Sequence, residues 1–282
     1  MGELDGKTVL VTGANSGIGR QTALELAGRG ARVHLACRSE SKAVPVIEEI
    51  RSATGRAMAA AFCPLDLSSL ASVRSGAEFF RQTGEPLHVL VNNAGVAGQR
   101  GITADGFELA FGVNHLGHFL LTALLLDDLR ASAPARVVTV ASDAHFQARG
   151  VDFDAVHRST PGFTGLREYA VSKLCNVLFT QELARRLGAP EVSGVTTYAV
   201  HPGVIASDIW RRIPWPVGPV AKLFMGSPES GARTSVFCAS APELATSTGG
   251  YYVAAAPRPP SPRATPELAA ELWRRSEEWV AA

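Results

Sequence analysis

The segment TVLVTGANSGIG, residues 8–19, joins an apolar, β-branched run to a glycine-rich turn. Gly13, Gly17 and Gly19 let the backbone turn tightly, so that N–H groups and a helix starting near Ile18 can face a pyrophosphate. A glycine-rich turn that only connects a strand to a helix is the alternative. The segment therefore predicts the first strand, turn and helix of a dinucleotide-binding sheet.

Six apolar, β-branched runs alternate with amphipathic, helix-favouring segments along the chain. The runs are residues 7–13, 31–38, 58–67, 87–95, 135–142 and 194–203. Nearly continuous apolar strands are typical of sheets covered on both faces. We expect one α/β domain over residues 1–282, built as a doubly wound parallel sheet with its ligand beyond the carboxyl ends of the strands. A last helix is expected over residues 267–280.

The composition narrows the possible partners. Of 282 residues, 46% are hydrophobic, so the chain can bury one large core. A net charge of +1, without basic runs interleaved with aromatic residues, argues against nucleic acid. Four separated cysteines without a Cys-x-x-Cys pattern are typical of reduced thiols in a cytoplasmic protein. No membrane anchor is predicted, because Asp127 and Asp128 interrupt the most apolar stretch before it reaches spanning length.

The end of the second apolar run indicates which dinucleotide binds. A carboxylate about 20 residues beyond the glycines suits the ribose of NAD, whereas an arginine suits the phosphate of NADP. Arg38 follows Gly19 by 19 residues, and a guanidinium can hold a phosphate through two parallel hydrogen bonds. We therefore predict NADP(H), with Ser39 or Lys42 adding to the phosphate site. A solvated Arg38 that only opens a loop is the alternative.

Tyr169 and Lys173 have the spacing of two residues on one face of a helix. Such pairs are common on helix surfaces. A cation near a phenol also favours the phenolate, however, and would move its pKa from near 10 toward neutral pH. The pair is therefore a candidate general acid with its electrostatic partner.

Taken together, the motifs resemble those of the short-chain dehydrogenase/reductase family, and most of all its retinol dehydrogenase branch. The matching stretches are TGANSGIG, LDL, NNAG, the asparagine of FGVNHLG, the serine of VASDAH, YAVSK and HPGV. The resemblance implies a Rossmann-type fold and an oxidoreductase that interconverts a carbonyl compound and its alcohol; the preference for NADPH over NADH is predicted from Arg38. The resemblance also implies homo-oligomers.

The resemblance assigns roles to individual residues. Tyr169 would give its proton to the carbonyl, Lys173 would support it and bind the nicotinamide ribose, and Ser142 would bind the substrate oxygen. Asn114 would hold a water in the proton path. The implied cofactor contacts are Gly13, Asn15, Ser16, Gly17, Ile18, Gly19, Arg38, Ser39, Asp66, Leu67, Asn93, Ala94, Gly95, Tyr169, Lys173, Pro202, Gly203, Val204 and Ser207. Asn93 and Asn114 keep a structural alternative, in which each satisfies neighbouring backbone groups.

Two features depart from the common pattern of the family: the spacing between the serine and the tyrosine, and the lack of the N-terminal membrane anchor that several retinol dehydrogenases carry, which makes retinoid itself a doubtful substrate. Tyr169 follows Ser142 by 27 positions, so residues 143–168 add a loop beside the expected site. Residues 205–226 form a long apolar stretch that predicts a substrate lid. Its apolar members are Trp210, Ile213, Trp215, Val217, Val220, Leu223, Phe224 and Met225. A lid of this kind favours a lipophilic aldehyde or ketone as substrate, while packing of the segment into the core or an oligomer interface is the alternative.

Other functions are less consistent with the sequence. A hydrolase would pair Ser142 with His145 or His201, but the chain has no Gly-x-Ser-x-Gly motif. His115 and His118 lack a third ligand at metal spacing, so no metal is predicted. A cofactor-binding regulator without turnover, or a ketoreductase for a more polar secondary metabolite, remains possible on this fold.

Overall fold

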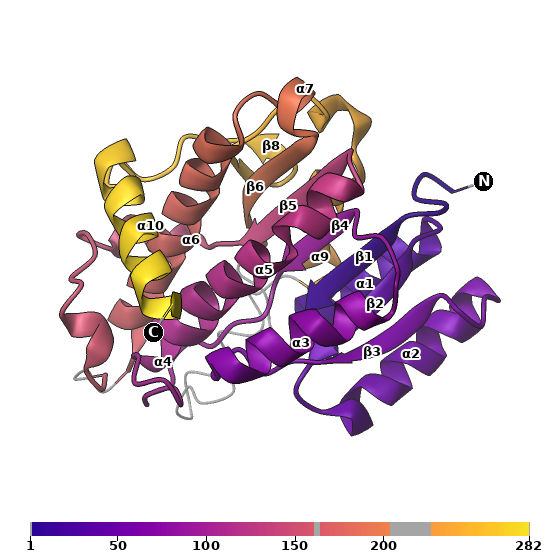
Figure 1. Ribbon diagram of the computed structural model, residues 1–282, viewed down its shortest axis with the longest axis horizontal. Coiled ribbons are helices and arrows are strands. Elements are labelled where there is room, and N and C mark those ends of the chain that lie inside the picture. Colours follow the sequence, from indigo (N-terminus) through magenta and orange to yellow (C-terminus); the bar gives the residue numbers. More distant parts are fainter. Residues whose placement is uncertain (1, 161–163, 204–226, 282) are drawn as a thin grey trace.

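The computed structural model describes residues 2–160, 164–203 and 227–281. In this part of the chain, one sheet with the strand order β3-β2-β1-β4-β5-β6-β7-β8 forms the centre of the molecule (Figure 1). The strands are β1 (Thr8–Thr12), β2 (Arg32–Cys37), β3 (Ala60–Pro64), β4 (Val89–Asn92), β5 (Ala135–Val140), β6 (Val195–His201), β7 (Gly250–Val253) and β8 (Ala256–Pro257). Neighbouring strands are parallel except β7 and β8. The fold class predicted from the sequence is confirmed.

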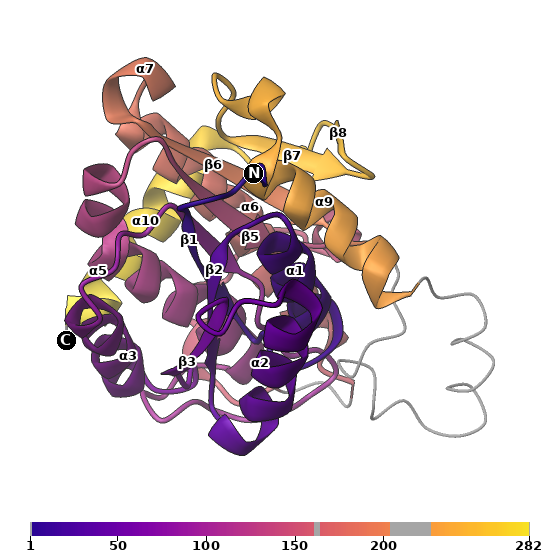
Figure 2. The same ribbon diagram turned by 90° about the vertical axis from the view of Figure 1, so that its right-hand side faces the viewer.

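Helices cover both faces of the sheet, as Figure 2 shows in a view along its layers. The helices are α1 (Gly17–Gly28), α2 (Glu40–Thr54), α3 (Leu70–Gln82), α4 (Leu109–Phe111), α5 (Gly117–Ala131), α6 (Leu166–Leu187), α7 (Pro190–Ser193), α9 (Pro228–Ser240) and α10 (Pro266–Ala281). α1, α2 and α9 lie on one face and α3, α5 and α6 on the other, with α10 packed against α6. This double cover explains why every residue of β1 and β4 is buried.

Local sequence explains how these helices begin and pack. Ser69 caps α3, because its hydroxyl accepts the backbone N–H of Ser72. Val73, Ala77 and Phe80, three or four residues apart, then form the buried face of the helix. α10 packs on α6 through Trp273, whose ring stacks on that of Phe179 at a centroid distance of 5.8 Å.

The order of strands reverses beside β1, since β1 pairs with β2 on one side and with β4 on the other. A crevice is expected where connections leave a parallel sheet in opposite directions. β7 was not among the six predicted strands, although it extends the sheet by pairing in parallel with β6. Its core, Gly250–Val253, is only 4 residues long, too short to show a clear pattern in the sequence.

One helical stretch is long and apolar enough to span a membrane. Leu109–Ala131 has 23 residues and a most apolar window of mean hydropathy 1.6, yet 78% of that window is buried within the fold. A core helix of a globular domain passes the same test. The stretch is interrupted by η1 (Gly112–Leu116), a turn of π-helix between α4 and α5, and it packs α5 against α3 and β5.

Candidate active site

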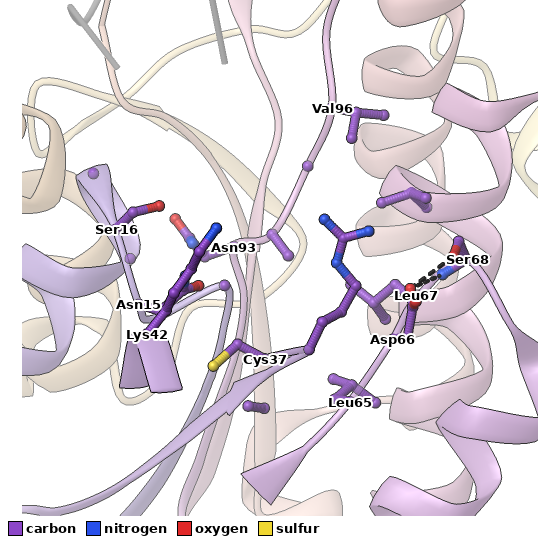
Figure 3. A pocket seen from close by; sticks show the side chains of 18 of the residues that line it. Asn15, Ser16, Cys37, Lys42, Leu65, Asp66, Leu67, Ser68, Asn93 and Val96 are labelled. Atoms are coloured by element: carbon purple, nitrogen blue, oxygen red, sulfur yellow. Dashed lines mark hydrogen bonds between the residues drawn. The ribbon is translucent and has the colours of Figure 1, made fainter. Parts of the chain in front are cut away.

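A cavity of about 720 Å³ lies at the carboxyl ends of β1 to β4 (Figure 3). Asn15, Ser16 and Lys42 lie on one side of it, and Leu65 to Ser68 lie on the other. The predicted cofactor residues that line the cavity are Gly13, Asn15, Ser16, Gly17, Ile18, Gly19, Arg38, Asp66, Leu67, Asn93, Ala94 and Gly95. The structure thus brings together residues from four separate loops at one edge of the sheet.

The glycine turn depends on contacts that a side chain would block. Gly13 has φ +66°, and a Cβ there would lie 3.0 Å from the Cα of Ala94. A Cβ at Gly19 would overlap the Asn93 amide and the Gly13 carbonyl. Ser16 precedes α1 without capping it through its side chain, and the first turn of α1 contains no acidic residue. The positive end of α1 is therefore free to attract an anion such as a pyrophosphate.

The end of β2 supplies two cations to the same cavity. Arg38 and Lys42 both line it, and neither forms an ion pair with any residue that the structure describes. Ser39 does not line the cavity; its hydroxyl lies 3.0 Å from that of Ser41, which does. Ser41 rather than Ser39 lines the cavity. α2 begins at Glu40, so Ser41 lies in its first turn and Ser39 precedes the helix.

Residues after β3 and β4 complete the cavity. One carboxylate oxygen of Asp66 accepts the backbone N–H and the hydroxyl of Ser68, at 2.9 and 2.7 Å, which fixes the orientation of the carboxylate. Asn93 donates from its side-chain amide to the Thr12 carbonyl at 2.8 Å. Asn93 therefore ties β4 to β1 while it also lines the cavity, so both interpretations of this residue hold in part.

Asn114 lies in the π-helical turn η1 and is fully buried. Its side chain accepts the N–H of Val96 at 2.8 Å and donates to the Val96 carbonyl at 3.0 Å and to the Ser172 hydroxyl at 2.9 Å. These bonds use both N–H groups of the amide and one lone pair of its oxygen. The side chain therefore holds Val96, which follows the NNAG turn, to Ser172 on α6, and the backbone carbonyl of Asn114 faces His118.

His118 connects this carbonyl to the glycine turn. Its Nδ1 lies 3.0 Å from the Asn114 carbonyl and its Nε2 lies 2.8 Å from the Thr12 hydroxyl. A carbonyl only accepts, so Nδ1 carries the hydrogen and Nε2 accepts one from Thr12. The same Thr12 oxygen accepts the N–H groups of Asn93 and Ala94, both at 2.9 Å. Sequence reasoning missed this role, because only the fold brings residue 12 next to residue 118.

Ser142, Tyr169 and Lys173 meet beside the cavity. Tyr169 and Lys173 lie one helical turn apart on α6, and the ammonium nitrogen is 5.6 Å from the centre of the Tyr169 ring. The side chain of Ser142, directly after β5, is hydrogen-bonded to the Tyr169 hydroxyl. Lys173 Nζ donates to the Val140 carbonyl at 2.8 Å. A Cβ on Gly95, which lines the cavity, would be 3.6 Å from Lys173 Nζ, so the group adjoins the cavity.

Burial dominates the titration of this group. It raises the pKa of Tyr169, although the hydrogen bond with Ser142 opposes the increase. It lowers the pKa of Lys173 to about 7. The expectation that Lys173 would lower the pKa of Tyr169 is therefore wrong for the protein alone, because desolvation penalises the charged form of each side chain.

The contacts of the other histidines do not match those expected for a hydrolase or for a metal site. His145 approaches the backbone carbonyl of Ser142, and His201 Nδ1 accepts the backbone N–H of Asp143. His115 Nε2 lies 3.0 Å from the Ser276 hydroxyl on α10. Within the described ranges no group of three or more His, Cys, Asp or Glu side chains is arranged to hold a metal.

The remaining predicted cofactor residues come after β6 in the chain. Pro202 and Gly203 follow β6 and do not line the cavity. Val204, Ser207 and the expected lid at residues 205–226 lie outside the described residues. Ser41, Ser68 and Gln99 line the cavity without having been predicted; their positions depend on loop geometry rather than on a motif.

The short chain dehydrogenase family model matches residues 7–215, most of the chain. The chain belongs to this family. It is 44% identical to human retinol dehydrogenase 13 over 98% of this chain and 85% of that protein. It is 48% identical to human retinol dehydrogenase 11 over 89% of this chain and 78% of that protein. It is therefore an oxidoreductase of the retinol dehydrogenase branch, as the motifs indicated.

Solved structures of other proteins share this architecture. A crystal structure of an uncharacterised protein from Mycobacterium paratuberculosis aligns with a TM-score of 0.79 and 34% identity, over 99% of this chain and 95% of that one. Levodione reductase aligns with a TM-score of 0.72 and 22% identity, over 89% of this chain and 96% of that one. The second likeness concerns the fold alone.

Proposed function

We propose that this short-chain dehydrogenase interconverts a lipophilic aldehyde or ketone and its alcohol with NADP(H), and that Tyr169 is its general acid and base. The observation that supports the proposal most directly is the contact between the Tyr169 hydroxyl and Ser142, with Lys173 on the same helix face. A proton donor, a second hydroxyl and an amine thus meet beside a cavity of dinucleotide dimensions.

The residues around the cavity fit a dinucleotide. The uncapped start of α1 and the close-packed glycines suit the pyrophosphate, and Asp66 with Leu67 suits the adenine. Arg38 and Lys42 supply positive charge without a carboxylate partner among the described residues, which favours the extra phosphate of NADP over the ribose of NAD. When bound, the nicotinamide gives or takes the hydride.

The side chains of the chain itself would manage the proton and the carbonyl. Ser142 and Tyr169 would both hydrogen-bond to the substrate oxygen, so that charge developing on this oxygen is stabilised as Tyr169 transfers its proton. Lys173, held by the Val140 carbonyl, would contact the nicotinamide ribose and favour the phenolate when it is protonated. Asn114 would contribute through its backbone carbonyl, since both side-chain N–H groups are already bonded and the side-chain oxygen already accepts from Val96.

A lipophilic substrate is supported by the apolar composition of residues 205–226 and by the names of the relatives, which are retinol dehydrogenases. Each buried methylene contributes about 0.8 kcal/mol. We therefore expect kcat/KM to rise along a series of longer aliphatic aldehydes, with retinal as a bulky member of the panel.

The test is Tyr169→Phe, assayed by NADPH oxidation with this panel. The variant should bind NADPH normally but lose about 100- to 10,000-fold in turnover, because only the transferable proton is removed. Tyr198→Phe is the matched control. It removes the hydroxyl of another buried tyrosine, which donates to the Leu244 carbonyl in the core. Turnover of Tyr169→Phe close to that of Tyr198→Phe at saturating NADPH would refute the acid role.

A further inference from the structure

The turn that carries Ser142 is held to the C-terminal part of the chain by two sets of hydrogen bonds, one made by His145 and one by Asp143. Ser142 is extended, and the helical turn η2 (Asp143–Gln147) follows at once. The Ser142 hydroxyl oxygen accepts the N–H of Ala144 at 3.2 Å. This contact orients the hydroxyl within the turn, but it cannot place the turn itself relative to α6 and Tyr169.

His145 forms the first attachment. It is completely buried, and its Nδ1 lies 2.6 Å from the Ser142 carbonyl while its Nε2 lies 3.0 Å from the backbone nitrogen of Ser261. The carbonyl must accept and the N–H must donate, so the ring is neutral with its hydrogen on Nδ1. One imidazole therefore bridges the backbone of Ser142 and a segment more than 100 residues later in the sequence.

Asp143 forms the second attachment. Its carboxylate accepts from the Tyr251 hydroxyl at 2.7 Å and from Arg258 Nη1 at 3.0 and 3.2 Å. Its backbone N–H donates to His201 Nδ1 at 3.2 Å. Tyr251 is buried on β7, whereas Asp143 and Arg258 are partly exposed at the surface. The two residues that follow Ser142 at positions 143 and 145 thus both contact the segment from Tyr251 to Ser261.

We propose that residues 251–261 position Ser142 for its contact with Tyr169, and that His145 is the positioning residue that transmits this constraint. The proposal rests on the roles proposed above for Ser142 and Tyr169. His145 touches the Ser142 backbone and not its hydroxyl in the described contacts, so it acts through Ser142. A hydrogen-bonded carbonyl fixes the direction in which the Ser142 side chain leaves the turn. Small misplacements of such groups slow the chemical step much more than they weaken binding.

The test compares two amide replacements of His145. In His145→Asn the amide N–H occupies the position of Nδ1 and can still donate to Ser142, whereas in His145→Gln the amide reaches only the position of Nε2 and can still accept from Ser261. We expect His145→Gln to lose about 10- to 100-fold in kcat with KM for the aldehyde and affinity for NADPH within about twofold of native. His145→Asn should recover most of this loss. His34→Gln, at a buried histidine of β2 that is paired with Glu85 near the opposite edge of the sheet, is the control for replacing a core imidazole.

Two further variants make the outcome decisive. Arg258→Met removes a contact to Asp143 from the surface side, where folding should tolerate the change, and should lower kcat with KM unchanged. Ser142→Ala, in the same assay, reports on the proposed function itself. Native turnover in Ser142→Ala overturns both proposals. Loss of turnover in Ser142→Ala, together with native kcat in His145→Gln and Arg258→Met, overturns the positioning proposal alone, as does equal loss in the Asn and Gln variants.

Discussion

At the scale of single residues, Lys173 shows how burial changes chemistry. It is 3% exposed, and its amine has one backbone acceptor and no carboxylate partner among the described residues. A protonated amine in such a place is costly, which is why its pKa falls to about 7. Near neutral pH the side chain can thus be either charged or neutral, and a small electrostatic change decides which form is populated.

This shift predicts how stability depends on pH. The pKa of Lys173 is about 7 in the folded protein and 10.5 as a reference for the unfolded chain. Between these values the unfolded chain binds the extra proton, so the unfolding free energy should rise with pH, by at most about 1.4 kcal/mol per unit. Urea unfolding from pH 7 to about 9.5 measures the slope. Lys173→Met should have a smaller slope; identical slopes would show that Lys173 stays protonated in the fold.

Arg38 gives a second prediction at this scale. If its guanidinium binds the phosphate of NADPH, Arg38→Asp should lose about 1.5 to 3 kcal/mol of NADPH binding and prefer NADH instead. Titration with each cofactor measures the two affinities. Arg130→Asp is the charge control, because Arg130 forms an exposed pair with Asp127 at the end of α5, away from the cavity. Equal affinities for NADH and NADPH in the native protein would contradict the assignment.

At the scale of elements, α1 contains three glycines, and two of them, Gly19 and Gly28, lie in very different surroundings. Gly19 packs against the NNAG turn with no room for a Cβ, whereas a Cβ on Gly28 would meet nothing within 4 Å. Gly19→Ala should push the Asn93 amide or the Gly13 carbonyl out of place and weaken cofactor binding at least tenfold. Gly28→Ala, in the last turn of the same helix, should keep native cofactor affinity. Its free energy of unfolding in urea should be equal to the native value or higher by up to about 1 kcal/mol. Native cofactor affinity in Gly19→Ala would show that the turn can adapt.

The elements also show what the sequence could and could not predict. The six apolar strands and the glycine turn were predictable, because burial on both faces and a positive φ at Gly13 each require particular residue types. The π-helical turn at Asn114 was not, since its sequence is that of an ordinary apolar helix. Neither were the roles of His118 and His145, whose partners are 106 and 116 residues away in the chain and meet them only in the folded sheet.

At the scale of the whole molecule, buried histidines limit stability in acid. Burial lowers the pKa of His115 to about 3 and that of His118 to about 4, from a reference of 6.5. As the pH falls below about 6.5, the unfolded chain takes up protons that the folded protein refuses, so the unfolding free energy should fall. The His115 ring contacts Ser276 on α10, and the His118 ring contacts Thr12 at the end of β1, so protonating either ring places a charge inside the core.

Urea unfolding between pH 7 and about 4.5 tests this expectation. His115→Gln should reduce the slope of stability against pH by the contribution of one proton, whatever its effect on stability at pH 7. A native slope in His115→Gln would mean that another group governs acid unfolding.

Among the described residues, those that line the cavity run from Gly13 to Val113, whereas Ser142, Tyr169 and Lys173 all come later. A ribosome makes the chain from its N-terminus, so each of these lining residues is translated before Ser142, Tyr169 and Lys173. The residues of the cavity are therefore synthesised before the residues proposed to carry out the reaction. A premature stop codon between Val113 and Ser142 would therefore yield a fragment that contains each of these described lining residues and none of the three side chains proposed to carry out the reaction.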